Sequence, residues 1–180
     1  MSADHTSDSV AADLEAKLDS HEKAVRAEAL HALCAQAKAD PGMFPEVKPV
    51  SNMHAHTFFS YNCCGYSPTR FAWLARRAGL EAGGIVDFDV LDGLDEFIEA
   101  GRAVGLKTAV GLESRVFVPE FSRRVINSPG EPGISYHMGS GLTSTRLAPT
   151  ALDFLKQMRN EAAGRNNEIV KRVNAHLRPV

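Results

Sequence analysis

The chain has 180 residues, of which 44% are hydrophobic and 23% are charged, and its formal net charge at pH 7 is -2. This composition predicts a single globular domain with a buried core and excludes a disordered chain. The mixed, nearly balanced charges argue against a surface that binds nucleic acid.

Cysteine usage and the N-terminal residues indicate a cytoplasmic protein. Cys34, Cys63 and Cys64 are odd in number and lack Cys-x-x-Cys spacing, which disfavours both a disulfide framework and a thiolate zinc site. The first residues are polar and acidic, without the apolar segment of a signal peptide, and no stretch is long enough to cross a membrane. We therefore expect no membrane partner.

An N-terminal helical segment is expected first. Residues 10–39 lack glycine and proline, and their apolar side chains recur at near-helical spacing. This pattern predicts one helix, or two helices with a break near Ser20, ended by Asp40-Pro41-Gly42. We assign residues 1–45 to this segment and residues 46–180 to an α/β domain.

Strands and helices then alternate. Residues 47–54, 84–86 and 108–112 are predicted strands, and residues 68–78 and 93–104 are predicted helices, the first of which begins with Ser67 as N-cap and ends at Gly79. Short connections in this order are typical of a parallel sheet built from βαβ units. A short strand at 134–137 and a long polar helix at 151–177, divided or kinked at Gly164, are expected to follow.

Residues with side chains that can bind a metal ion stand at the end of each predicted strand. The first strand ends in His54 and His56, the second in Asp87 and Asp89, and the third in Glu113. Histidines at positions i and i+2 of an extended segment point the same way, although such a pair is weak evidence alone. Because the carboxyl ends of parallel strands meet at one edge, these residues are expected to converge on a metal site. Asp87 could be a ligand or could orient an imidazole.

Four short motifs in this order resemble those of the PHP domain family, named after bacterial DNA polymerases and histidinol phosphatase. The resemblance covers about residues 50–170. The motifs are Asn52-Met-His54-Ala-His56-Thr57, Val86-Asp87-Phe88-Asp89, Gly111-Leu112-Glu113 and His137-Met138-Gly139.

The resemblance implies a distorted (β/α)7 barrel whose metal cluster hydrolyses phosphate esters. It implies that His54 and His56 bind one ion, that Glu113 bridges two ions about 3.5–4 Å apart, and that His137 binds the second. Zinc, manganese and iron all suit these donors. Arg115, two residues after Glu113, could clamp a phosphate or could be an ordinary surface arginine.

The sequence also departs from the family pattern. Asn62 and Phe88 stand where family members commonly carry ligands of a third ion, so we expect two ions at most. The later histidine and Asp-x-His of the family are not found after His137. We therefore expect an N-terminal portion of a longer protein, containing part of the barrel. Its open sheet edge and apolar helix faces would pack against the C-terminal remainder or form an oligomer.

The sequence therefore predicts a metal-dependent phosphoesterase that acts on a small phosphorylated substrate and uses two ions to activate water. Two alternatives remain open. The same cluster could hydrolyse C–N or C–O bonds, as in amidohydrolase-like barrels, or the chain could be a truncated, non-catalytic remnant that binds metal.

Overall fold

The structure is a computed structural model that describes residues 3–60 and 64–177. The chain divides into two compact units, Met1–Thr143 and Ser144–Val180, each of which is described by itself.

The first unit begins with two helices, α1 (Ala3–Lys17) and α2 (Lys23–Ala39). The break near Ser20 is confirmed, because residues 18–22 connect the two helices. A short 3-10 helix, η1 (Pro41–Met43), follows α2, and the Asp40 carboxylate accepts a hydrogen bond from the Gly42 N–H at its start. The described residues of this stretch are therefore mainly helical.

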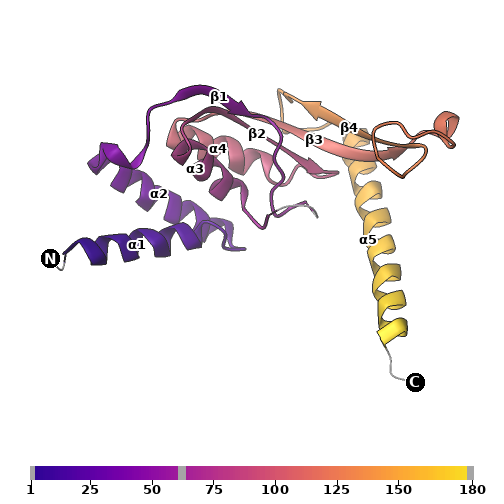
Figure 1. Ribbon diagram of the computed structural model, residues 1–180, viewed down its shortest axis with the longest axis horizontal. Helices are drawn as coiled ribbons and strands as arrows, with labels where there is room; N and C mark the ends of the chain where they lie inside the picture. Colours follow the sequence, from indigo (N-terminus) through magenta and orange to yellow (C-terminus); the bar gives the residue numbers. More distant parts are fainter. Residues whose placement is uncertain (1–2, 61–63, 178–180) are drawn as a thin grey trace. The chain divides into compact units, whose positions relative to one another are not determined.

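The βαβαβ order is confirmed. Strands β1 (Lys48–Asn52), β2 (Leu80–Phe88) and β3 (Lys107–Phe117) are parallel, with α3 (Pro68–Arg77) and α4 (Leu94–Val104) between them (Figure 1). The Ser67 hydroxyl caps α3 by accepting a hydrogen bond from the Arg70 N–H. Gly79 lies just beyond α3 with a φ of 78°, a conformation that glycine adopts without steric cost.

The fourth strand departs from the expected parallel barrel. β4 (Ile134–Ser140) pairs with β3 in the antiparallel direction, and the sheet order is β1-β2-β3-β4. The pairing runs from Gly111 opposite Ser140 to Phe117 opposite Ile134, so β3 continues beyond Glu113, where the sequence pattern placed its end. A second 3-10 helix, η2 (Pro119–Phe121), begins the connection to β4. The first three strands alone have the arrangement expected of part of a barrel.

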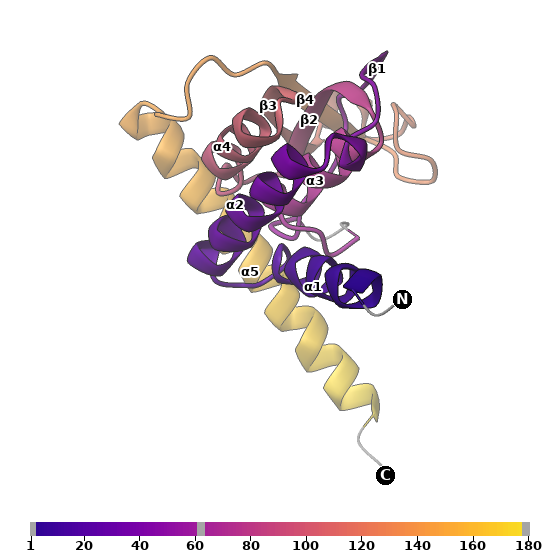
Figure 2. The same ribbon diagram turned by 90° about the vertical axis from the view of Figure 1, so that its left-hand side faces the viewer.

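The first unit has three layers (Figures 1 and 2). α3 and α4 cover one face of the sheet, and α1 and α2 lie beyond these helices. Leu18 and Leu33 from the N-terminal segment share one hydrophobic core with Trp73, Phe97 and Ile85. The predicted boundary at residues 45 and 46 therefore marks a change from helices to mixed structure inside one compact unit, because both sides contribute to the same core.

β1 is an edge strand in which every residue is exposed. In the second unit, α5 (Pro149–Leu177) is a continuous 29-residue helix without a buried residue. It passes through Gly164 unbroken, so the prediction of a division there is wrong; one glycine costs about 1 kcal/mol in a helix, too little to end one of this length. Among the described residues, no helix has the length and apolar character needed to cross a membrane.

Candidate metal centre

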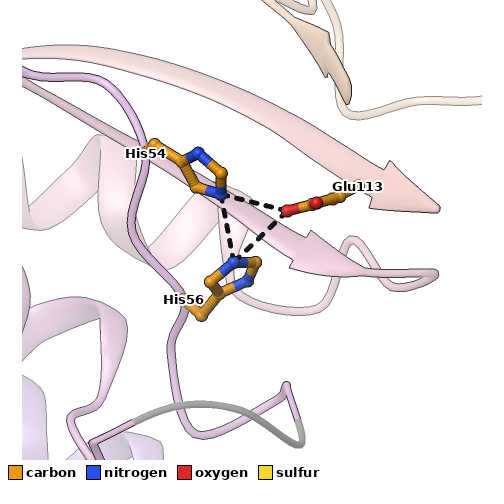
Figure 3. A group of neighbouring side chains, drawn as sticks. All are labelled: His54, His56 and Glu113. Atoms are coloured by element: carbon orange, nitrogen blue, oxygen red, sulfur yellow. Dashed lines mark hydrogen bonds and ion pairs between the residues drawn. The ribbon is translucent and has the colours of Figure 1, made fainter. Parts of the chain in front are cut away.

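Three of the predicted ligands lie together. His54 Nε2 lies 3.0 Å from Glu113 Oε2 and 3.2 Å from His56 Nε2, and His56 Nε2 lies 3.3 Å from Glu113 Oε2 (Figure 3). In the part of the chain that the structure describes, this is the one group of three side chains able to share a metal ion. The structure therefore brings together two imidazoles and one carboxylate from distant parts of the sequence.

The spacing of these three atoms fits a metal ion. Metal–ligand distances of about 2.0–2.1 Å separate neighbouring ligand atoms by about 3.3 Å in tetrahedral and about 3.0 Å in octahedral coordination. The observed separations of 3.0, 3.2 and 3.3 Å lie in this range. Two histidines and a glutamate are also a ligand set of catalytic zinc sites, which keep further positions open.

The backbone positions the two histidines beside the sheet. Beyond the end of β1, the Ala55 carbonyl accepts a hydrogen bond of 2.9 Å from the Val86 N–H of β2. The His54 N–H donates to the Asn52 side-chain oxygen at 3.1 Å. The segment that carries both imidazoles thus stays extended along β2, while Glu113 comes from the neighbouring strand, β3.

His56 is the more enclosed of the two histidines. Its side chain is 12% exposed, against 51% for His54. Its ring stacks on Phe88 with centroids 5.0 Å apart, and its Nδ1 lies 3.4 Å from the Ser60 hydroxyl. Burial lowers the pKa of His56, against the opposing effect of Glu113. A lowered pKa favours the neutral imidazole, which is the form that binds metal.

Asp87 lies outside the group of three ligands. The register pairs Phe88 with Glu113, so these two side chains share a face of the sheet, and the alternation of a strand turns Asp87 to the opposite face. Its carboxylate accepts hydrogen bonds from the Thr57 N–H at 2.5 Å and the Thr57 hydroxyl at 2.6 Å. Burial raises the pKa of Asp87, although the Thr57 hydrogen bonds oppose this. The geometry favours the orienting role, and a role as ligand stays a prediction.

His137 also lies outside the group. It stands opposite Ser114 in the β3–β4 register, whereas Met138 stands opposite Glu113. Residues that face each other across an antiparallel pair project on the same side, so His137 and Glu113 project on opposite sides. His137 is exposed, and its role as a ligand stays a prediction.

Arg115 shares the face of the sheet that carries Glu113, as the alternation along β3 predicts. Its guanidinium forms an ion pair with Glu131, which also accepts a hydrogen bond from the Ser128 hydroxyl. The Glu131 hydrogen bond raises the pKa of Arg115. The arginine is thus held by the loop before β4, and a role in binding phosphate stays a prediction.

Thr57, Ser60 and Phe88 are supporting residues whose roles the sequence pattern did not reveal. Thr57 and Ser60 are 0% and 4% exposed, which is unusual for small polar residues in a loop. Their position within four residues of His56 was the available signal. Phe88 provides a flat apolar wall beside the imidazole. Asn62, which was expected to replace a third-ion ligand, lies outside the described residues.

Comparisons with known proteins add a partial likeness to a solved structure. No family model matches the sequence, and no curated protein matches it. Among solved structures, the chain is similar to a crystal structure of a proposed metal-dependent phosphoesterase from Bifidobacterium adolescentis, with 30% sequence identity and a TM-score of 0.35. The match covers 40% of this chain and 24% of that protein, so this chain corresponds to about a quarter of its length. The expected family therefore rests on the sequence motifs.

Proposed function

We propose that this protein is a metal-dependent hydrolase whose metal ion is held by His54, His56 and Glu113. The observation that carries the proposal is the triangle of two Nε2 atoms and one carboxylate oxygen, with sides of 3.0 to 3.3 Å. The two histidines follow the end of β1 and the glutamate lies on β3, two parallel strands that flank β2. Sites in α/β folds gather toward the carboxyl ends of such strands.

The environment of the three donors suits hydrolysis. A divalent ion bound here would lower the pKa of a water molecule and polarise a substrate oxygen. Glu113 and His56 are largely buried, whereas the His54 side chain is 51% exposed. The buried pair keeps the donors in place, and the exposed side gives water and substrate access.

Phosphate esters are the proposed substrate class. The resemblance of the four sequence motifs to the PHP family supports this choice, and Arg115 lies on the same face of the sheet as Glu113. A substrate phosphate would compete with the Glu131 carboxylate for the Arg115 guanidinium, because both anions suit its planar fork of donors.

We propose that the residues described by the structure bind one metal ion tightly per chain. The second ion implied by the motifs needs His137 near Glu113, and the β3–β4 register turns these side chains to opposite faces. A second ion at this site would therefore depend on other donors.

Metal titration tests the site directly. We expect zinc or manganese to bind the purified chain with about one ion per chain, and Glu113→Gln to weaken binding by more than the roughly 10–100-fold typical of outer-shell substitutions. His31→Gln is the matched control, because His31 is exposed on α2 outside the group. Equal affinity of wild type and Glu113→Gln would overturn the site.

Hydrolysis is tested separately on the metal-loaded chain. A panel of phosphomonoesters and phosphodiesters should be hydrolysed by wild type and not by Glu113→Gln. Hydrolysis of amides or carboxylic esters alone would overturn the assignment as a phosphoesterase. If the metal-loaded chain hydrolyses no substrate, the proposal that it is a hydrolase is rejected.

A further inference from the structure

The turn between α1 and α2 contacts both ends of the loop that follows His56. The loop starts at Thr57, and its two ends are joined by a hydrogen bond of 2.8 Å from the Phe58 N–H to the Tyr66 carbonyl. Residues 18–22 of the turn lie against Phe58 at one end and Ser67 at the other. The N-terminal helices thus reach the segment beside the candidate metal centre.

The Ser67 end is held by two hydrogen bonds. The Ser67 N–H donates to the Asp19 carboxylate at 2.8 Å, and the Ser67 hydroxyl donates to the Leu18 carbonyl. Leu18 and Ser67 are both fully buried. The hydroxyl bond lies in the interior, where competition from water is weak. The Asp19 side chain, which accepts the other bond, is 30% exposed. Together the two bonds hold the backbone at this end of the loop.

The Phe58 end is held by ring contacts. His21 stacks on the Phe58 ring with centroids 5.8 Å apart and an interplanar angle of 9°. The Arg26 guanidinium lies 5.2 Å from the centre of the same ring. Arg26 is itself fixed, because it is buried, pairs with Glu96 and donates to the Ser20 carbonyl at 2.7 Å.

We propose that the α1–α2 turn positions the metal-binding histidines, with Asp19 and His21 as positioning residues. Phe58 lies two residues after His56, and the intervening Thr57 is bonded to Asp87. The backbone that carries His56 is therefore held by β2 on one side and by the turn on the other. The inference rests on the proposed function of His54, His56 and Glu113 as metal ligands.

The geometry of the ligands explains why such distant contacts matter. Metal sites need their donors within about 0.5 Å of the productive arrangement. The turn contributes no ligand atom to the group of three. Only two peptide units separate Phe58 from His56, so a shift of Phe58 would also move His56. Loss of the turn's contacts should therefore weaken metal binding while the sheet stays folded.

His21 gives the sharpest test, because it is exposed and its substitution leaves the core intact. We expect His21→Ala to weaken cobalt or zinc binding by about two- to tenfold, the range allowed by loss of one aromatic pair. His21→Phe keeps a ring over Phe58 and should bind within about twofold of wild type. The bands of bound cobalt in the visible spectrum should shift in His21→Ala and not in the control His31→Ala.

Asp19 gives an independent test at the other end of the loop. Asp19→Ala removes the acceptor for the Ser67 N–H, whereas Asp19→Asn retains a side-chain oxygen. We expect weaker metal binding in Asp19→Ala and recovery in Asp19→Asn, with the folded state of each variant checked by circular dichroism.

The outcomes separate the two proposals. A wild-type chain that binds no metal would reject the proposed site itself. Wild-type binding with unchanged affinity and cobalt spectra in both folded alanine variants would reject only the positioning role. If one of the two variants, His21→Ala or Asp19→Ala, does not fold, the other variant decides the result. Weaker binding without recovery in His21→Phe and Asp19→Asn would also count against positioning.

Discussion

Asp87 accepts two hydrogen bonds from Thr57, one from its backbone N–H at 2.5 Å and one from its hydroxyl at 2.6 Å. Thr57 directly follows His56, so a carboxylate on β2 fixes the backbone next to the buried imidazole. Both residues are almost completely buried. The pair supports the candidate centre without contributing a donor to the group of three.

Removal of the Thr57 hydroxyl should therefore affect both stability and metal binding. Thr57→Val leaves one Asp87 oxygen without its donor, and a buried unsatisfied group costs about 1–3 kcal/mol. We expect unfolding by urea to show a loss of this size and calorimetry to show about tenfold weaker metal binding. Thr57→Ser keeps the hydroxyl and should resemble wild type. Unchanged metal affinity in Thr57→Val would show that Asp87 does not orient the histidines.

Gly84 allows the histidine segment to lie close to β2. A Cβ added at Gly84 would lie 2.8 Å from the Met53 carbonyl oxygen, immediately before His54. Gly84→Ala should push the segment away from the sheet. We expect its loss of metal-binding free energy to exceed its loss of unfolding free energy. Gly139→Ala, whose Cβ would meet no atom within 4 Å, is the control within the same sheet. Equal metal affinities of the two variants would contradict this prediction.

The buried Arg26–Glu96 pair should make stability depend on pH. Burial acts to raise the Glu96 pKa, but hydrogen bonds from Arg26 and Thr69 and the Arg26 charge outweigh it and hold the pKa below its ordinary value of 4.5. Because the folded-state pKa is lowered, the stabilisation is present above pH 4.5 and is lost as pH falls through the folded-state value. Glu96→Gln should cost about 3 kcal/mol or more at pH 7, since Arg26 would stay buried without its partner.

Urea unfolding of wild type and Glu96→Gln between pH 7 and pH 3 measures this effect. The difference between the two free energies of unfolding should shrink below pH 4.5. Comparing the two proteins cancels the contribution of Asp87, whose raised pKa acts with the opposite sign. Glu99→Gln, on the exposed side of α4, should show no such change. A difference that stays constant with pH would contradict the prediction.

The apolar face of α5 should cause self-association. Six apolar residues recur at helical spacing along it: Leu155, Met158, Ala162, Ile169, Val173 and Leu177. Ile169 and Val173 are 42% and 48% exposed. Arg165 and Asn166 interrupt this stripe between Ala162 and Ile169. Apolar stripes of this kind on a helix are normally covered. We expect the chain to associate at micromolar concentration in sedimentation experiments and Val173→Glu to shift it toward the monomer. Asn160→Glu, on the polar side, should leave association unchanged.

Local signals in the sequence were sufficient for much of the fold and for three donors. Ser67, Pro68 and Gly79 mark the ends of α3, because capping depends on residues adjacent in the chain. The spacing of His54 and His56 and the position of Glu113 two parallel strands further along the chain were enough to place these residues together. The carboxyl ends of parallel strands lie at the same edge of a sheet.

The sides of the sheet could not be assigned in the same way. Whether His137 and Glu113 share a face depends on the register between β3 and β4, and a shift of one residue reverses it. The loop between these strands fixes that register through hydrogen bonds such as Val118 N–H to the Gly133 carbonyl. Such contacts between loop residues leave no periodic pattern in the sequence. Asp87 was likewise ambiguous, because its partner Thr57 is distant in sequence.

β1 carries its own protection against strand addition. It is an edge strand of the described sheet, and its sequence contains Lys48 and Pro49. Proline offers no N–H to an incoming strand and lysine would place a charge in the new pairing, which are two common devices that keep sheet edges from joining. The register with β2 is also irregular between Lys48 and Ser51. Aggregation through β1 is therefore disfavoured, which reduces the risk of fibre growth at this edge of the sheet.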